Sequence, residues 1–273
     1  MVGHVSRIPE VGDYFLWEIM NESVIVVRSD ATTIKAFFNV CRHKGSRVCL
    51  EAEGKKRLFT CPYHAWTYNL DGRLANARSM GTSPESGLRE ACMPKLEAWR
   101  EKASALGHPV DNFGSADDDP DYHGYIRAPL GNASLSETQD GSPAAPIMGK
   151  FREFDGGHST VVFNPFSWML GLTDFMVMFR FSPRDKRKTD LEVTWLVAPG
   201  LEAGKDYDLD KVCYAWRVNS PQDKMIVENN QTGVESYRFT QGPYSEQEQP
   251  VVKLIDWYRN KMRTAVDVAG DSF

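Results

Sequence analysis

Two short segments of the chain each place one cysteine close to one histidine. The first is Cys41-Arg42-His43, and the second is Cys61-Pro62-Tyr63-His64. Thiolates are soft ligands that suit iron and zinc, and imidazole binds both metals. Two cysteines and two histidines can form a tetrahedral zinc site, or hold a [2Fe–2S] cluster with the thiolates on one iron and the imidazoles on the other. Metal binding is therefore the chemistry that these residues indicate.

The order of the ligands within each segment separates these alternatives. Zinc sites usually pair like with like, as C-x2-4-C and H-x3-5-H, whereas both pairs here are mixed, with the cysteine first. Two antiparallel hairpin loops would then bring the cysteines together at one depth and the histidines together nearer to solvent. Lys44-Gly45 and Pro62 are typical of tight, rigid loops. The pattern favours the cluster over zinc, and over four core residues at this spacing by chance.

Short strands are expected to position these two loops. Residues 14–17, 23–27 and 34–40 are apolar or β-branched runs separated by turn residues such as Asn21-Glu22 and Ser29-Asp30. Residues 57–60 and 66–70 read as further strands, and Asp71-Gly72 as a turn. The regular spacing predicts a small all-β domain that ends near residue 100.

The second half of the chain mixes strands and helices. Apolar side chains alternate in residues 173–182 and 189–198, which predicts two strands, and residues 129–150 read as a loop. Residues 221–238 read as a helix whose stripe of Asp223, Val227, Asn230 and Val234 faces an interior. A last helix is expected after Ser245 and Glu248, which have capping-box spacing. Its apolar stripe comprises Val251, Leu254, Ile255, Tyr258 and Met262.

Composition excludes several classes of protein. The 273 residues carry a formal net charge of −5, which argues against nucleic-acid binding. No apolar run approaches the ~20 residues that span a membrane, and the first residues lack the apolar region of a signal peptide. Five cysteines are an odd number, which disfavours a disulfide scaffold, and Cys92 and Cys213 are expected in the core. We therefore expect a cytoplasmic protein.

The cysteine–histidine segments and their surroundings resemble a known family. Residues 38–45, 61–68 and 70–74 are similar to the Rieske domain of ring-hydroxylating oxygenase α subunits. Residues 221–223, 228–234 and 241–245 resemble the C-terminal part of the catalytic domain in the same family. Respiratory Rieske proteins have one further cysteine in each loop, where this chain has Ser46 and Tyr63. The resemblance is therefore to the oxygenase type.

The resemblance implies an α+β fold in two domains. Residues 1–105 would form an N-terminal all-β Rieske [2Fe–2S] domain, with Cys41, His43, Cys61 and His64 as the cluster ligands. Residues 106–273 would form a partial, helix-grip-like α+β catalytic domain with an antiparallel sheet. The activity implied is that of an oxidoreductase, a mono- or dioxygenase. The cluster would relay electrons from a reductase or ferredoxin to a mononuclear Fe(II) that activates O2. The activated O2 would hydroxylate or demethylate a small organic substrate. The resemblance also implies a homotrimer.

A mononuclear iron of this family is held by two histidines and one carboxylate. By resemblance Asp223 is the carboxylate, whereas an ordinary acidic residue in a first helical turn is the alternative. The histidines should form a His-x4-His pair, and no pair among His4, His43, His64, His108, His123 and His158 has that spacing. Residues 115–122, where the second histidine is expected, are mainly acidic, and His123 is a stray candidate. We therefore expect a central block of the family to have no counterpart in this chain.

The missing His-x4-His pair leaves two functions open. If the histidines belong to the parent protein, the chain is an oxygenase component; if they are lost, it is an electron-transfer Rieske protein. A zinc-stabilised structural protein is the third alternative. The substrate would be an aromatic or a quaternary ammonium compound, with residues 228–231 and 242–245 favouring the second. Candidate pocket residues are Phe163, Phe166, Trp168, Met169, Phe175 and Trp195, although aromatic residues on strands usually belong to the core.

Overall fold

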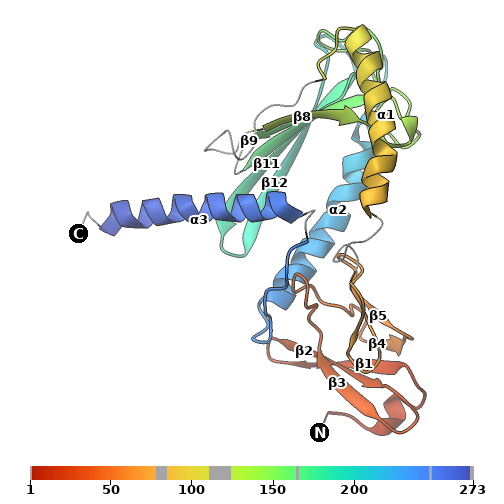
Figure 1. Cartoon of the computed structure of the whole chain (residues 1–273), viewed down its shortest axis with the longest axis vertical. Helices are drawn as coiled ribbons and strands as arrows, with labels where there is room; N and C mark the ends of the chain where they lie inside the picture. The colour runs from red at the N-terminus through yellow and green to blue at the C-terminus, as the bar shows by residue number, and fades with distance from the viewer. Residues whose placement is uncertain (1, 78–84, 111–123, 164–165, 246–247, 271–273) are drawn as a thin grey trace. The chain divides into compact units, whose positions relative to one another are not determined.

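The computed structural model describes residues 2–77, 85–110, 124–163, 166–245 and 248–270, and for residues 85–94 and 266–270 the backbone alone. The chain forms two compact units (Figure 1). Met1–Glu85 and Ser220–Gln249 make the first, and Ser86–Asn219 and Pro250–Phe273 make the second. The expected acidic loop at residues 115–122 and the candidate ligand His123 lie outside the described residues. The domain boundary at residue 105 stays a prediction.

The first unit contains two small antiparallel sheets. The larger has the order β3-β2-β1-β4 and comprises β1 (Asp13–Ile19), β2 (Glu22–Arg28), β3 (Ile34–Phe38) and β4 (Glu53–Lys55). The smaller has the order β5-β6-β7 and comprises β5 (Phe59–Thr60), β6 (Thr67–Tyr68) and β7 (Leu74–Asn76). A short 3-10 turn, η1 (Val5–Arg7), precedes them. The strands expected between residues 12 and 70 are confirmed.

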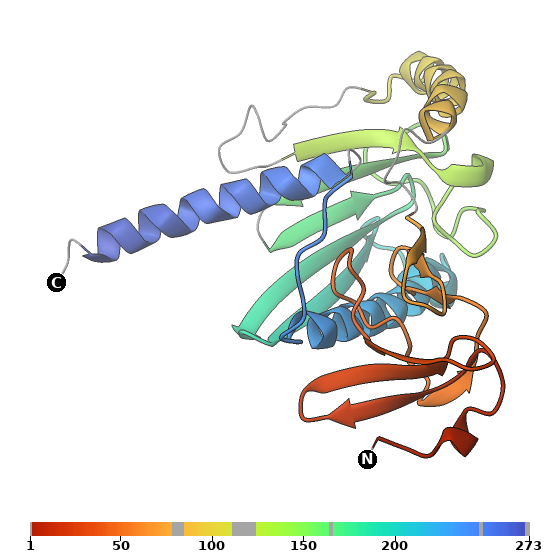
Figure 2. The same cartoon turned by 60° about the horizontal axis from the view of Figure 1, so that its bottom comes forward.

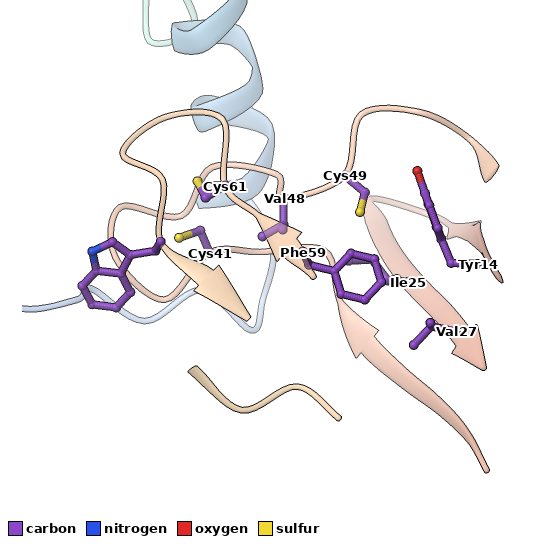
Figure 3. Packing of buried hydrophobic residues seen from close by; sticks show 9 residues of the cluster. Tyr14, Ile25, Val27, Cys41, Val48, Cys49, Phe59 and Cys61 are labelled. Atoms are coloured by element: carbon purple, nitrogen blue, oxygen red, sulfur yellow. The ribbon is translucent and has the colours of Figure 1, made fainter. Parts of the chain in front are cut away.

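The core of the first unit lies behind the two cysteine-bearing loops. Tyr14 and Val27, register partners on β1 and β2, are buried there together with Ile25. Figure 3 shows Cys41 and Cys61 on two loops with their sulfur atoms near each other, and Cys49 apart from them beside Tyr14. The β-branched run of β2 supplies much of this packing, because such side chains fit a half-buried pleated surface.

The second unit is built on a five-stranded antiparallel sheet with the order β12-β11-β10-β9-β8, seen in green in Figure 2. Its strands are β8 (Gly124–Pro129), β9 (Gly157–Phe163), β10 (Ser167–Gly171), β11 (Phe175–Asp185) and β12 (Lys188–Val197). Apart from the short turn η2 (Gly131–Ala133), residues 130–150 are irregular, as expected. Phe175, Val177 and Phe179 of β11 are buried, so the predicted alternation on that strand is confirmed.

The described residues also form the helices α1 (Glu85–Ala105), α2 (Leu209–Val234) and α3 (Gln249–Gly270). Both helices expected in the last third of the chain are present, but α2 begins well before the predicted start. Pro221 lies inside it, whereas the sequence reading took this proline as the first helical residue. Among the described residues, no helix is both long and apolar enough to cross a bilayer.

The expectation that the stripe of α2 faces an interior is wrong for the chain by itself. Asp223 is exposed and Val227 is 64% exposed, so the stripe of α2 does not face an interior at these positions. Val251, Leu254, Tyr258 and Met262 of α3 are also exposed. Both stripes have helical spacing, but spacing alone does not say whether anything packs against a face.

Candidate functional site

The first cysteine–histidine loop follows β3 and is closed by its own backbone. The N–H of Cys41 donates to the carbonyl of Ser46 at 2.8 Å, and the N–H of Gly45 donates to the carbonyl of Cys41 at 3.0 Å. Gly45 has a φ of 88°, a left-handed conformation that glycine adopts without strain. The loop therefore turns back tightly directly after His43.

The second loop, between β5 and β6, repeats the same backbone pattern. The N–H of Cys61 donates to the carbonyl of Trp66 at 2.8 Å, and the N–H of Ala65 donates to the carbonyl of Cys61 at 3.0 Å. Ala65 has a φ of 58° at the position that corresponds to Gly45. The two loops thus share one backbone turn with the cysteine at the same position, whereas His43 and His64 stand two and three residues after it.

The two cysteines lie together in the core, with exposures of 1% for Cys41 and 3% for Cys61. A hydrogen bond from Cys61 lowers the pKa of the Cys41 thiol to about 6, whereas the same contact and burial raise the pKa of Cys61. The hydroxyl of Tyr68 lies 3.2 Å from the Cys41 sulfur and also accepts the N–H of Arg42 at 3.0 Å. This environment favours a thiolate, the form in which cysteine binds metals.

The two histidines form the second pair. The ring centres of His43 and His64 are 4.8 Å apart, and the rings are inclined by 68°. His43 is buried and stacks on Trp66 with ring centres 4.8 Å apart, whereas His64 is exposed and stacks on Tyr63 at 3.8 Å. Burial and the neighbouring His43 lower the pKa of His64, which favours the neutral imidazole that can bind a metal. All four predicted ligands are thus brought together in two pairs.

The nitrogen atoms of His43 fit a metal-ligand role. Its Nδ1 atom is buried and has no hydrogen-bond partner among the described residues, while its Nε2 atom lies 3.4 Å from Oε2 of Glu248. Ligand histidines commonly offer one nitrogen to the metal and the other to a carboxylate. Among the described residues, no three cysteine, histidine or acidic side chains gather as they would around a single ion. A pair of cysteines beside a pair of histidines suits a two-iron cluster better than one zinc ion.

Glu248 is a residue of this site that sequence reasoning missed. Its carboxylate also contacts Lys44 at 2.8 Å and accepts the N–H and hydroxyl of Ser245 at 2.7 and 3.0 Å. Burial raises the pKa of Glu248, but Lys44, Ser245 and His43 outweigh it and hold the pKa at about 2. The capping-box spacing predicted the Ser245 contact correctly. No local signal pointed to His43, which lies far away in the sequence.

The segment that carries Glu248 packs closely on the first loop. A Cβ atom on Gly45 would lie 2.7 Å from the ring of Phe239 and 2.9 Å from Val234, and one on Gly233 would overlap the Gly45 carbonyl oxygen. The N–H of Gly242 donates to the carbonyl of His43 at 3.1 Å. Residues 233–245 and Glu248 therefore line one side of the first cysteine–histidine loop within the first unit.

The candidate ligands of the mononuclear iron do not lie together among the described residues, in contrast to the four cluster ligands. Asp223 lies on α2 in the first unit. Burial raises the pKa of Tyr63 there, and the charges of Glu248 and Asp223 raise it further. In the second unit, His108 is buried, its Nδ1 atom lies 2.8 Å from Asp155, and its Nε2 atom accepts the N–H of Arg152 at 3.1 Å. Both nitrogens of His108 are therefore engaged. Among the described residues, no two histidines lie together with a carboxylate.

Of the aromatic residues that were candidates for a substrate pocket, some pack against one another in the core and others are exposed to solvent. Trp168 stacks on Phe179 with ring centres 3.8 Å apart, and Trp216 lies edge-on to both. Phe175 is fully buried in the same core, whereas Phe163 and Phe166 are 45% and 49% exposed. Cys213 is buried in this core, as expected, and the side chain of Cys92 lies outside the described residues.

Comparison with known proteins places both halves of the chain. A model of the Rieske [2Fe-2S] domain matches residues 1–94, and a model of the ring-hydroxylating alpha subunit catalytic domain matches residues 90–264. The glycine betaine monooxygenase oxygenase subunit of Chromohalobacter salexigens is 29% identical, over 99% of this chain and 82% of the relative. That alignment spans 364 positions, more than the 273 residues of this chain, so the relative has internal residues that this chain lacks.

Two further relatives carry related names. The carnitine monooxygenase oxygenase subunit of Escherichia coli K12 is 47% identical over 79 residues, which cover 29% of this chain and 21% of the relative. A solved quaternary ammonium Rieske monooxygenase aligns with 92% of this chain and 87% of its own at 20% identity, with a TM-score of 0.33. The chain belongs to the ring-hydroxylating oxygenase α subunits, a family of oxidoreductases whose two domains imply a Rieske [2Fe–2S] cluster and a mononuclear iron.

Proposed function

We propose that Cys41, His43, Cys61 and His64 hold a Rieske [2Fe–2S] cluster, with the cysteines on one iron and the histidines on the other. The observation that carries this assignment is the arrangement at His43. One of its nitrogens is buried without a partner, the other meets Glu248, and the paired cysteines lie beside it. When bound, such a cluster accepts and passes on one electron at a time.

The chain's own residues suit that role. The Tyr68 hydroxyl lies against the Cys41 sulfur and can spread its negative charge through a hydrogen bond. Glu248 fixes the orientation of the His43 ring and places a carboxylate beside it. The exposed His64 offers a route between the cluster and the surface, where a reductase or ferredoxin would deliver electrons.

The substrate class that we propose is a quaternary ammonium compound. The support is that the full-length relative in Chromohalobacter salexigens carries the name of a glycine betaine monooxygenase subunit, and that a shorter match carries the name of a carnitine monooxygenase. In that case the protein is an oxygenase component, and Asp223 is the carboxylate ligand of the mononuclear iron. The two histidine ligands would have to come from residues other than His108, which is engaged with Asp155.

A second candidate function is electron transfer without oxygenation. It is favoured by the absence of a group of two histidines and a carboxylate among the described residues. It is also favoured by the alignment with the Chromohalobacter salexigens relative, which has internal residues that this chain lacks. In this alternative the cluster loops remain complete, and only the chemistry of the second iron is lost.

One experiment separates the two functions and tests the cluster itself. The protein is purified without oxygen, its iron, zinc and acid-labile sulfide are measured, and the reduced form is examined by electron paramagnetic resonance. About two irons per chain with a Rieske-type signal supports the carrier, and about three supports the oxygenase. Consumption of O2 with glycine betaine or carnitine, after reduction, confirms the oxygenase. Zinc in place of iron would refute both functions.

Two further properties remain proposals. A homotrimer is implied by the family resemblance, and the exposed apolar stripe of α3 offers surface for contacts between subunits. A cytoplasmic location is supported by Cys49 and Cys213, which form no disulfide within the described part of the chain. Light scattering coupled to gel filtration tests the first, and cell fractionation tests the second.

A further inference from the structure

The first unit contains a cavity of about 410 Å³ that the proposed electron relay does not use. It lies between β3, the first cysteine–histidine loop and the turn after β6, and all its lining residues belong to the first unit. Phe37, Phe38, Phe59 and Tyr68 give it aromatic walls. Pockets of ~300–1,000 Å³ with mostly apolar walls are typical of small-molecule sites.

The charged residues that line this cavity are both arginines, Arg42 and Arg238. Arg42 donates from Nη1 to the Thr240 hydroxyl at 2.8 Å, and the Arg238 guanidinium lies 5.6 Å from the ring centre of Phe38. Neither arginine is paired with a carboxylate among the ion pairs of the described residues. The cavity therefore presents two positive charges that no carboxylate on its own walls balances.

The nearest acidic candidate on the adjoining strand is already engaged elsewhere. Glu22, at the start of β2, accepts the Ser236 hydroxyl at 2.6 Å and the N–H of Tyr237 at 2.9 Å. These contacts hold the segment before Arg238, whose guanidinium lies 5.6 Å from the ring centre of Phe38 and 5.7 Å from that of Tyr237. Two exposed arginines thus lie beside the aromatic walls of the cavity, a combination that suits an aromatic ring carrying an anion.

We propose that this cavity binds a small aromatic carboxylate of one or two rings, with the ring against Phe37 and Phe38 and the carboxylate at Arg238 and Arg42. Glycine betaine and carnitine carry a cationic head group beside their carboxylate, whereas the charged lining residues of this cavity are both arginines. The site is therefore distinct from the proposed substrate site and does not depend on it. Tyr68 is shared, because its ring lines the cavity and its hydroxyl contacts the Cys41 sulfur. The bound molecule would therefore lie one side chain away from a cluster ligand.

The test uses the full chain with its metal centre in place and 1-naphthoate as the probe, measured by isothermal titration calorimetry at low salt. We expect one binding site for 1-naphthoate. The matched cation 1-naphthylmethylammonium should bind at least about tenfold more weakly, because charge-assisted hydrogen bonds to arginine favour the anion. Acetate, which has the charge without the ring, should also bind at least about tenfold more weakly.

Variants locate the site. Arg238→Gln should weaken 1-naphthoate binding about tenfold or more, whereas Lys35→Gln, which removes an exposed charge from β3 outside the cavity, should leave it unchanged. Ala36→Phe places a ring in the cavity without removing a charge and should also weaken binding. The visible spectrum of each variant reports whether the metal centre and its loops are intact. Equal binding by Arg238→Gln and Lys35→Gln, or equal affinity for the anion and the cation, would overturn the proposal. If Arg238→Gln does not fold, unchanged binding by Ala36→Phe overturns it instead.

Discussion

The Nε2 atom of His43 lies 3.4 Å from Oε2 of Glu248, so the first cysteine–histidine loop is tied to a residue at the far end of the chain. The same carboxylate meets Lys44 at 2.8 Å and is held by Ser245. A single side chain thus links the loop that presents a metal ligand to the segment that precedes α3. Several of the properties that we expect of the centre follow from this contact.

Replacing Glu248 with glutamine should raise the midpoint potential of the cluster. The carboxylate is a negative charge beside His43, and removing it favours the reduced, more negative form of the centre. A spectroscopic redox titration of the wild type and of Glu248→Gln measures the change. Glu202→Gln, at an exposed site in the second unit, is the matched control and should leave the potential unchanged. A potential that is equal in all three proteins would contradict this role of Glu248.

The contribution of Glu248 to stability should depend on pH in a defined window. Its folded pKa of about 2 lies below the ordinary value of 4.5, so the unfolded chain binds the proton more tightly. The contribution is therefore complete above pH 4.5 and is lost as the pH falls towards 2. At pH 7, Glu248→Gln should cost about 1 kcal/mol. Because acid acts on the metal centre of both proteins, the quantity to follow is the difference between their melting curves. A difference that stays constant from pH 7 to pH 3 would refute the prediction.

Breaking a buried ion pair in the second unit should lower the free energy of unfolding far more than breaking a surface pair. Arg127 and Asp155 are both fully buried, and the guanidinium donates to the carboxylate at 2.5 Å. Asp155→Asn removes the buried carboxylate that contacts both Arg127 and His108 and should lower the free energy of unfolding by about 3–5 kcal/mol. Asp190→Asn breaks an exposed pair with Arg184 and should cost about 0–1 kcal/mol. Urea unfolding of both variants measures the costs, and similar values would show that the buried pair is not a structural anchor.

The tight packing on the first loop predicts a specific defect. Gly45→Ala introduces a Cβ atom 2.7 Å from Phe239 at a φ of 88°, whereas Gly200→Ala introduces one at a φ of 84° with nothing within 4 Å. Backbone strain of about 1 kcal/mol is common to both variants. Only Gly45→Ala adds the clash, so only it should also lose iron. Iron content and thermal midpoint of the two proteins check this, and equal iron content would argue against the close approach.

Asp223 provides a test of the second iron. If the chain is an electron carrier, Asp223→Asn should leave the iron content at about two per chain. If Asp223 is a ligand in an oxygenase, the variant should lose about one iron of three. Asp256→Asn, on the exposed face of α3, is the control and should match the wild type in either case.

Local patterns in the sequence were sufficient for the cluster loops. The cysteines and histidines lie on short turns between strands, so their spacing already defines which side chains meet. The strands β1, β2 and β11 were also predictable, because their alternation or β-branched runs reflect one buried face. The same holds for the Ser245–Glu248 contact, which is a short-range capping interaction.

Contacts between distant segments could not be predicted in this way. Nothing near Glu248 indicates His43, and the start of α2 was missed because Pro221 was taken for a first helical residue although the helix continues through it. The stripes of α2 and α3 show where apolar side chains gather but not what covers them, and in the chain by itself Val227 and Tyr258 remain exposed.

The central claim is that two imidazoles bind one iron of a two-iron cluster, and pulsed electron paramagnetic resonance on the reduced protein tests it directly. Nitrogen couplings from two directly bound histidines are expected in the wild type, and the His64→Cys variant should retain the coupling from His43 alone. A wild-type spectrum without directly bound nitrogen, or a protein that holds zinc at this place, would contradict the account.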